Sequence, residues 1–195
     1  MHRRYIITSY NQYKLNYWAI PKCANTSIKS ALLNKIRKNT YHQNKWVHKN
    51  RNNPWLEFEE AINNNFINFT VTRNPYDRFL SLYKHFGVLE PFAELKNKKI
   101  NLDYFVNFIC NEYGDDKTCN YHVRQQIFYI SDQNLKICVD DVYKLENIDN
   151  FWKKYSLPKV VVNKSKTNDF SLTNSQKELI YQRYKKDFIL LGYKK

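Results

Sequence analysis

Short apolar runs and longer segments with helical periodicity follow one another along this chain. Residues 17–20 and 66–72 are rich in aromatic and β-branched side chains, a composition typical of strands. Each run leads into a segment, 26–38 and 75–85, in which apolar residues recur every three or four positions. The first half of the chain therefore predicts two strands, each followed by an amphipathic helix.

The second half of the chain continues this alternation with shorter elements. Residues 101–112 predict a helix with a regular apolar stripe. Thr173 and Gln176 have the spacing of a capping box, which predicts a final helix that reaches about Leu191 and ends before Gly192. The remaining predictions are short strands at 137–139, 142–145 and 160–162, a helix at 148–155, and loop with short helical pieces at 40–60.

Alternating strands and helices, without repeats or linker-like segments, predict a single domain over residues 1–195. We expect an α/β, P-loop-like, three-layer fold with a mostly parallel central sheet flanked by helices. A hydrophobic content of 43% and an aromatic content of 16% argue against disorder. Ligands of such sheets bind beyond the carboxyl ends of the strands, so functional residues are expected just after the strands at 17–20 and 66–72.

The first of these strand ends is followed by a tight turn with one lysine and several small residues. Its sequence is Pro21-Lys22-Cys23-Ala24-Asn25-Thr26-Ser27. Backbone N–H groups at a helix N-terminus point toward an anion, and the helix dipole favours negative charge there. The turn lacks the glycines of a Walker A loop, so an ordinary ATPase is a poor match. The pattern predicts a site for a phosphate-like group.

The second strand end carries an arginine and then a proline-initiated helix. The sequence is Arg73-Asn74-Pro75-Tyr76-Asp77-Arg78-Phe79-Leu80-Ser81-Leu82-Tyr83. Proline fits the first turn of a helix. Arg73 and Ser81 lie about two helical turns apart, so both can reach one anion only if the helix folds back beside the strand end.

Together these segments resemble the sulfotransferases, which use 3′-phosphoadenosine-5′-phosphosulfate, and especially the carbohydrate sulfotransferase branch. In that family a Pro-Lys-x-x-x-Thr-Ser loop holds the 5′-phosphosulfate, and a strand-ending Arg-x-Pro segment with a later Ser-x-Tyr holds the 3′-phosphate. Residues 142–148 resemble a late strand-to-helix segment of the family, and residues 162–165 resemble its late Asn-Lys-Ser loop. The resemblance therefore covers most of the chain.

The resemblance implies a role for individual residues. Lys22 is expected to be catalytic, because a cation beside the oxygen that bridges phosphate and sulfate stabilises the charge of the leaving group. Arg73 can pair with the 3′-phosphate through its planar guanidinium, whereas Arg78 is expected to pack or pair structurally. The expected donor-binding residues are Lys22, Cys23, Ala24, Asn25, Thr26, Ser27, Arg73, Ser81, Lys164 and Ser165.

Simpler roles stay open for several of these residues. Lys22 could be a solvated turn lysine, and Thr26 and Ser27 could serve only as helix N-caps. Arg73 could form a salt bridge with a nearby carboxylate. A surface loop without ligand contacts is the alternative for residues 164 and 165.

An acceptor hydroxyl that attacks sulfur must lose its proton, and a histidine with a pKa near neutrality suits that step. His48, between the two donor motifs, is the first candidate for the catalytic base. His122 is the second, in a segment where acceptor contacts are expected. His42, Glu57 and Glu59 stay open as substitutes.

The formal net charge of +14 attracts polyanions of many kinds, including a multiply charged nucleotide, a glycan and nucleic acid. The four cysteines have no C-x-x-C spacing, so neither a disulfide framework nor a zinc site is predicted, and no metal is expected. No apolar run approaches the length of a membrane span. We therefore expect a soluble, cytoplasmic enzyme, unless an N-terminal anchor has been removed.

The sequence thus predicts transfer of a sulfuryl group from 3′-phosphoadenosine-5′-phosphosulfate to an acceptor hydroxyl, with a carbohydrate suggested by resemblance alone. A P-loop kinase-like enzyme shares the architecture but should show Walker A glycines and a magnesium-binding aspartate after a strand. A basic nucleic-acid-binding module is less favoured, because it should interleave aromatic and basic side chains on one sheet face. Here the aromatic residues are spread along the chain.

Overall fold

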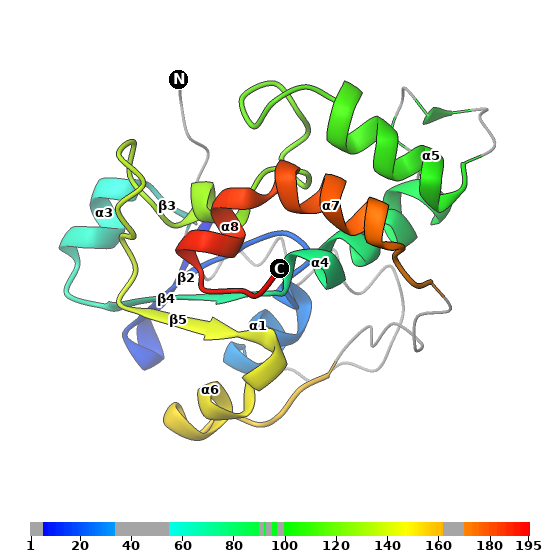
Figure 1. Cartoon of the computed structure of the whole chain (residues 1–195). Coiled ribbons are helices and arrows are strands. Elements are labelled where there is room, and N and C mark those ends of the chain that lie inside the picture. Colours follow the sequence, from blue (N-terminus) through cyan, green and yellow to red (C-terminus); the bar gives the residue numbers. More distant parts are fainter. Residues whose placement is uncertain (1–5, 34–54, 90–91, 93–94, 97–99, 162–169) are drawn as a thin grey trace. The chain divides into compact units, whose positions relative to one another are not determined.

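The computed structural model describes residues 6–33, 55–89, 92, 95–96, 100–161 and 170–195 (Figure 1). The chain divides into two compact units, Met1–Thr72 with Phe128–Lys164, and Arg73–Ile127 with Ser165–Lys195. We call them unit 1 and unit 2. Each unit has its own apolar core. The single domain expected from the sequence stays a prediction, because units of this kind can unfold together or separately.

Unit 1 is built around a five-stranded sheet with the order β3-β1-β2-β4-β5. The described elements are β1 (Ile7–Tyr10), a 3₁₀ turn η1 (Asn11–Tyr13), β2 (Leu15–Trp18), α1 (Asn25–Leu32), β3 (Trp55–Leu56), α3 (Phe58–Asn63), β4 (Ile67–Thr72), β5 (Asp141–Lys144), a 3₁₀ turn η6 (Leu145–Asn147) and α6 (Asp149–Lys154). Strand β4 pairs in parallel with β2 and β5, whereas β1 pairs antiparallel with β2 and β3. Four of the five strands therefore run in one direction, which confirms the mostly parallel sheet.

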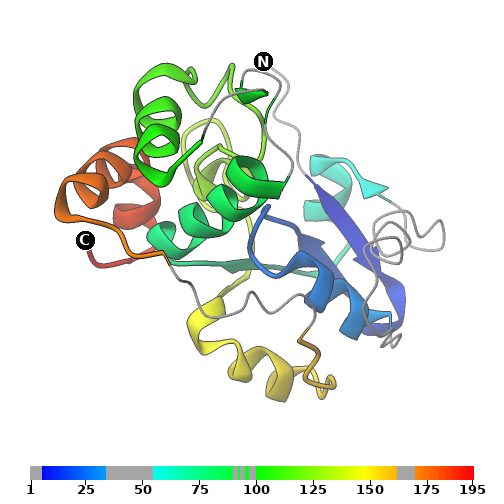
Figure 2. The same cartoon turned by 90° about the vertical axis from the view of Figure 1, so that its right-hand side faces the viewer.

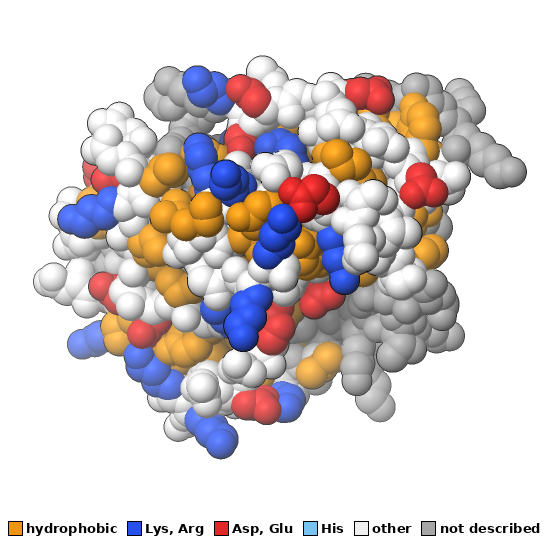
Figure 3. Space-filling model, in the orientation of Figure 1, with side chains coloured by type: hydrophobic (Ala, Val, Ile, Leu, Met, Phe, Trp, Pro, Cys, Tyr) orange, Lys and Arg blue, Asp and Glu red, His pale blue; other side chains and the backbone are white. Residues whose placement is uncertain are grey.

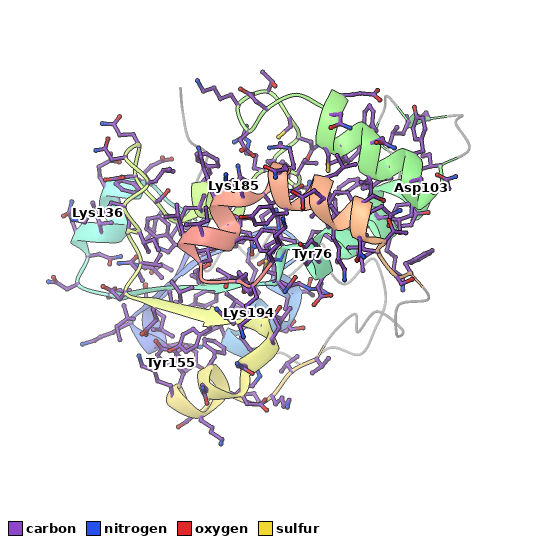
Figure 4. The ribbon with its side chains drawn as sticks, in the orientation of Figure 1. Tyr76, Asp103, Lys136, Tyr155, Lys185 and Lys194 are labelled. Carbon is purple, nitrogen blue, oxygen red and sulfur yellow. The ribbon has the colours of Figure 1, made fainter. Side chains whose placement is uncertain are left out.

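Helices lie on both faces of this sheet, with α1 and α6 below the strands in Figure 1 and α3 above them. On one face Phe69 of β4 stacks on Tyr17 of β2 and on Phe151 of α6, with ring centroids 5.1 Å apart in each pair. Successive strand residues point to opposite faces of a sheet. The next residue of β2, Trp18, packs its ring against Phe58 of α3, with ring centroids 5.7 Å apart. Tyr155, labelled in Figure 4, donates a hydrogen bond of 2.8 Å to a carboxylate oxygen of Asp141 and so ties the end of α6 to β5.

The sequence does not predict β1, which forms an antiparallel hairpin with β2. The turn between them has no glycine or proline, and Lys14 takes the left-handed conformation there with φ of 52°. Hairpin turns are usually recognised by Asn-Gly or Asp-Gly, so this turn carries little local signal. The predicted strand at 66–72 is confirmed as β4.

Unit 2 has helices as its described regular elements. These are α4 (Pro75–Leu82), the π-helical segment η2 (Tyr83–Leu89), α5 (Leu102–Asn107), the π-helical segment η4 (Phe108–Glu112), α7 (Asn174–Arg183) and α8 (Lys185–Leu190), and a 3₁₀ turn η5 (Gln126–Tyr129) lies where the chain passes to unit 1. Phe79 of α4 packs against Phe105 of α5 and against Tyr184, with ring centroids 5.7 and 6.2 Å apart. This aromatic cluster joins α4, α5 and the C-terminal helices into one core.

The C-terminal helix begins as predicted and ends differently. Thr173 Oγ1 accepts a hydrogen bond from Gln176 N, and Gln176 Oε1 accepts one from Thr173 N, which confirms the capping box. The helix is broken at Tyr184, whose φ of −111° and ψ of 23° leave helical geometry and separate α7 from α8. Gly192 follows α8 with φ of 64°, the left-handed conformation expected of a glycine after a helix.

Two predicted strands are wrong. Residues 137–139 form only an isolated bridge between Ile137 and Ser131. The connecting turn is held by Asp132 Oδ1, which accepts hydrogen bonds from two backbone N–H groups. Val160 is buried in the core of unit 1 with Phe151 and Trp152 of α6, Val161 is exposed, and neither valine belongs to a strand. The branched side chain of Val160 therefore packs in the core without β-pairing.

Candidate functional site

The loop from β2 to α1 lies at the carboxyl end of a parallel strand, as predicted. Lys22 and Ala24 have φ of 69° and 58°, the left-handed region that glycine enters readily and other residues rarely enter. Cys23 between them has a negative φ. Backbone nests that bind anions are built from residues of alternating handedness. The loop therefore takes two left-handed positions although it contains no glycine.

Buried contacts in unit 1 hold this loop. Tyr17 of β2 donates a hydrogen bond of 2.6 Å from Oη to Asn25 Oδ1. Burial raises the pKa of Tyr17, so the phenol keeps its proton and remains a donor. The Cys23 side chain is fully buried, and its N–H donates to Ile20 O at 3.2 Å. These contacts fix the first residue of α1 and the turn before it.

The first turn of α1 has no side-chain cap, because its N-cap residue is Ala24. The first N–H groups of any helix lack partners within the helix, and the dipole places partial positive charge at that end. Thr26 is half-buried and Ser27 is buried. This end of α1 can therefore offer N–H and hydroxyl donors to an anion.

A second lysine, Lys29, lies within α1 and was not singled out from the sequence. It is only 3% exposed, and burial lowers its pKa to about 8. No hydrogen bond or ion pair joins its side chain to another described residue. The sequence gives one indication that Lys29 lies near the loop. It follows Asn25 by four residues, so both residues are on the same face of the helix.

In unit 2, Arg73 follows directly after β4 and precedes α4. Asn74 caps this helix by accepting a hydrogen bond of 2.9 Å from Tyr76 N, and Pro75 occupies its first turn as predicted. The side-chain amide of Gln126 brackets the Arg73 backbone. Arg73 N donates to Gln126 Oε1 at 2.9 Å, and Gln126 Nε2 donates to Arg73 O at 2.8 Å.

The two other polar residues predicted along α4 differ in burial. Ser81 is half-buried. Arg78 is only 3% exposed and donates from Nη2 to His122 O at 2.9 Å, and its guanidinium lies 5.9 Å from the centre of the Tyr184 ring. Arg78 therefore packs and pairs inside unit 2, as expected from the sequence.

His122 is half-buried and in a defined orientation. Asn120 Oδ1 accepts a hydrogen bond of 3.0 Å from His122 N and also lies 2.9 Å from His122 Nδ1. Because this amide oxygen can only accept, Nδ1 carries the ring proton in the neutral imidazole and Nε2 is the basic nitrogen. Phe86 packs against the ring with a centroid distance of 4.8 Å.

Several predicted site residues lie outside the described residues. They are His42, His48, Lys164 and Ser165, whose roles stay predictions. Of the candidate carboxylates, Glu57 caps α3 through a capping box with Glu60, and Glu59 lies in the first turn of the same helix. The structure thus brings residues 22–27 together in unit 1 and places Arg73, Ser81 and His122 in unit 2.

Within the described ranges, no group of three or more His, Cys, Asp or Glu side chains could hold a metal ion. None of the described helices is long and apolar enough to cross a membrane. On the face drawn in Figure 3, Lys and Arg side chains are interspersed with acidic and apolar ones and do not form a continuous basic stripe.

Comparison with known proteins places the chain in a family. The model of the sulfotransferase family matches residues 5–194, nearly the whole chain. Comparisons with curated proteins and with solved structures gave no match. The strand–loop–helix at residues 15–32 and the strand–helix junction at 67–82 both lie inside the matched region. The chain is therefore an enzyme that belongs to the sulfotransferase family.

Proposed function

We propose that this enzyme transfers a sulfuryl group from 3′-phosphoadenosine-5′-phosphosulfate to a hydroxyl group of a carbohydrate, on a P-loop-like scaffold. The observation that carries the proposal is the loop at residues 21–27. Its left-handed Lys22 and Ala24 lead into an uncapped helix at the end of a parallel strand. This arrangement favours a phosphate or phosphosulfate group as the ligand.

The donor contacts follow from the chemistry of each residue. The N–H groups at the start of α1, with Thr26 and Ser27, bind the 5′-phosphosulfate, together with Lys22, Cys23, Ala24 and Asn25. Arg73 and Ser81 bind the 3′-phosphate, and Lys164 and Ser165 contact the nucleotide. The net charge of +14 supports attraction of a donor with several negative charges.

In the reaction, the acceptor oxygen attacks sulfur while the bond from sulfur to the bridging phosphate oxygen breaks. The negative charge that develops on the bridging oxygen is stabilised by the Lys22 ammonium. The acceptor proton passes to a base, and adenosine 3′,5′-bisphosphate leaves. His48 is the proposed base, and the Nε2 atom of His122 is the described alternative.

The proposal is tested by incubating the enzyme with donor labelled with ³⁵S and with separate sets of glycans, phenols and steroid alcohols. We expect label in a glycan product and release of the 3′,5′-bisphosphate in equal amount. Label only in phenols or alcohols would reject the carbohydrate acceptor. Phosphate transfer from ATP, with no sulfate transfer, would favour the kinase-like alternative.

The base is identified by replacing each candidate histidine with asparagine. His48→Asn should lower turnover by about 10²–10⁴-fold, the usual contribution of general-base catalysis, and leave donor binding intact. His122→Asn should mainly raise the acceptor KM. A His48→Asn enzyme with nearly normal turnover would assign the role to His122 or to a carboxylate.

A further inference from the structure

Gln126 makes two hydrogen bonds with the backbone of Arg73, the residue that follows β4. Its buried side-chain amide accepts from Arg73 N and donates to Arg73 O, at 2.9 and 2.8 Å. Beyond Thr72 the ladder to β5 has ended. The amide of Gln126 therefore supplies the two hydrogen bonds that a neighbouring strand would give to Arg73, and it fixes this residue where the sheet no longer does.

Gln126 is itself held by a buried carboxylate from the C-terminal helix. Asp187 of α8 is fully buried, and its Oδ2 and Oδ1 atoms accept from Gln126 N at 2.8 Å and from Ile127 N at 2.9 Å. Burial raises the pKa of Asp187 to about 6, although the nearby Arg78 favours the charged form. This pKa is still below neutrality, so near pH 7 the side chain is mostly charged and accepts both hydrogen bonds.

The neighbouring residue, Gln125, is anchored independently. Its N and Nε2 atoms donate to the two carboxylate oxygens of Asp116 at 2.9 and 2.7 Å, and its Oε1 accepts from Lys186 N at 3.0 Å. Gln125 is buried, as Gln126 is, and no hydrogen bond joins it to Arg73 among the described residues. Substitution of Gln125 therefore disturbs the anchoring of this segment alone, whereas substitution of Gln126 also removes the contact with Arg73.

We infer that Gln126 is a positioning residue, which orients Arg73 for the donor's 3′-phosphate and is held in place by Asp187. The inference rests on the proposed role of Arg73. A cation whose backbone is already fixed loses less conformational freedom when it binds its ligand. The C-terminal helix α8 thereby contributes to donor recognition without contacting the donor.

The test compares two nucleotides that differ only in the 3′-phosphate, adenosine 3′,5′-bisphosphate and adenosine 5′-monophosphate. Calorimetry measures both affinities, and the quantity compared is the affinity for the bisphosphate divided by the affinity for the monophosphate. This ratio is determined for the wild type, Arg73→Ala, Gln126→Met and the matched control Gln125→Met. We expect Gln126→Met to lower this ratio about tenfold, the effect of losing about one well-formed hydrogen bond, with little change for the monophosphate. Gln125→Met should lower thermal stability and leave the ratio unchanged.

The outcomes separate this inference from the proposed function. An unchanged ratio in Arg73→Ala would reject the role of Arg73 itself. A lowered ratio in Arg73→Ala with an unchanged ratio in Gln126→Met would overturn the positioning role alone. An equal loss in Gln125→Met would also overturn it, because any damage to the segment would then suffice.

Asp187→Asn provides a second variant if Gln126→Met does not fold. Asparagine has nearly the same size and keeps one of the two accepted hydrogen bonds. We expect a reduction of the ratio about threefold, between those of the wild type and Gln126→Met. A ratio equal to that of the wild type would contradict the proposed link from α8 to Arg73.

Discussion

Lys22 and Ala24 occupy left-handed backbone positions with ordinary side chains, a conformation that costs about 1–2 kcal/mol for each residue. Such strain persists where the surrounding structure fixes the chain, as the buried Cys23 and the Tyr17–Asn25 hydrogen bond do here. Strained loops of this kind are concentrated at functional sites. The geometry therefore supports a binding role for this loop.

Replacing Lys22 with alanine tests its proposed catalytic role. Alanine keeps a Cβ atom at the left-handed position, so the backbone strain is unchanged, and the side chain is lost beyond Cβ together with its amine. Because the amine is proposed to act on charge that develops during transfer, kcat should fall by about 10²–10³-fold while adenosine 3′,5′-bisphosphate still binds. Steady-state kinetics and calorimetry measure the two effects.

Lys14→Ala is the matched control, because Lys14 also has a left-handed backbone but lies in the turn between β1 and β2. Its turnover should stay close to that of the wild type. If Lys22→Ala lost product binding and turnover in equal proportion, Lys22 would be a phosphate anchor without a specific role in the transition state.

Lys29 predicts a pH dependence of stability. Its pKa is lowered to about 8 in the folded protein, below the ordinary lysine value of 10.5. Between these values the unfolded chain binds the proton and the folded chain does not, so the free energy of unfolding rises with pH. Below about pH 8 the buried amine is charged in both states, and the burial penalty is fully present.

Lys29→Met removes this penalty at nearly constant volume. We expect a stability gain of about 1–3 kcal/mol at pH 7, at about 1.4 kcal/mol for each unit of pKa shift, and a flatter profile between pH 8 and 10. Urea unfolding at a series of pH values measures both. A less stable variant with an unchanged profile would contradict the burial penalty assigned to the amine.

At the scale of elements, both strand–helix junctions that carry candidate residues could be predicted from the sequence. The turn at residues 21–24 and the helix that begins at Pro75 have strong local signals, namely a Pro-Lys turn and an Asn-Pro helix start. The two hydrogen bonds between Gln126 and the Arg73 backbone could not be predicted, because Gln126 is 53 positions away along the chain. Nor could β1, whose turn lacks glycine, or the π-helical continuation of α4 from Tyr83, which no local pattern marks.

The capping box of α7 is an element whose contribution can be measured. Thr173→Ala removes the oxygen that accepts from Gln176 N and should lower the free energy of unfolding by about 1 kcal/mol. Ser171→Ala, at an exposed position before the helix, should change stability by less than about 0.5 kcal/mol. Equal effects of the two substitutions would show that the cap contributes little.

At the scale of the whole molecule, the two compact units are interleaved in sequence. The chain passes between them three times, at residues 72–73, 127–128 and 164–165. Neither unit is a continuous segment, so neither can fold from one stretch of chain. The family match over residues 5–194 spans both units.

We therefore predict a single cooperative unfolding transition. Scanning calorimetry should give a calorimetric enthalpy equal to the van't Hoff enthalpy, as for one cooperative domain. Tryptophan fluorescence and far-UV circular dichroism should give the same midpoint. Two separated transitions, or different midpoints for the two probes, would mean that the units unfold independently.

The most direct test of the central claim is a thermal-shift titration of the wild-type enzyme with adenosine 3′,5′-bisphosphate, compared with adenosine 5′-monophosphate and ATP. A ligand that binds only the folded state at a hundred times its Kd adds about 2.7 kcal/mol of stability. For a chain of this size that corresponds to a rise in Tm of about 5–10 °C. We predict a shift of this order for the 3′,5′-bisphosphate at concentrations that leave Tm unchanged with the other two nucleotides. An equal or larger shift with ATP, or none with the 3′,5′-bisphosphate, would contradict the proposed sulfate donor.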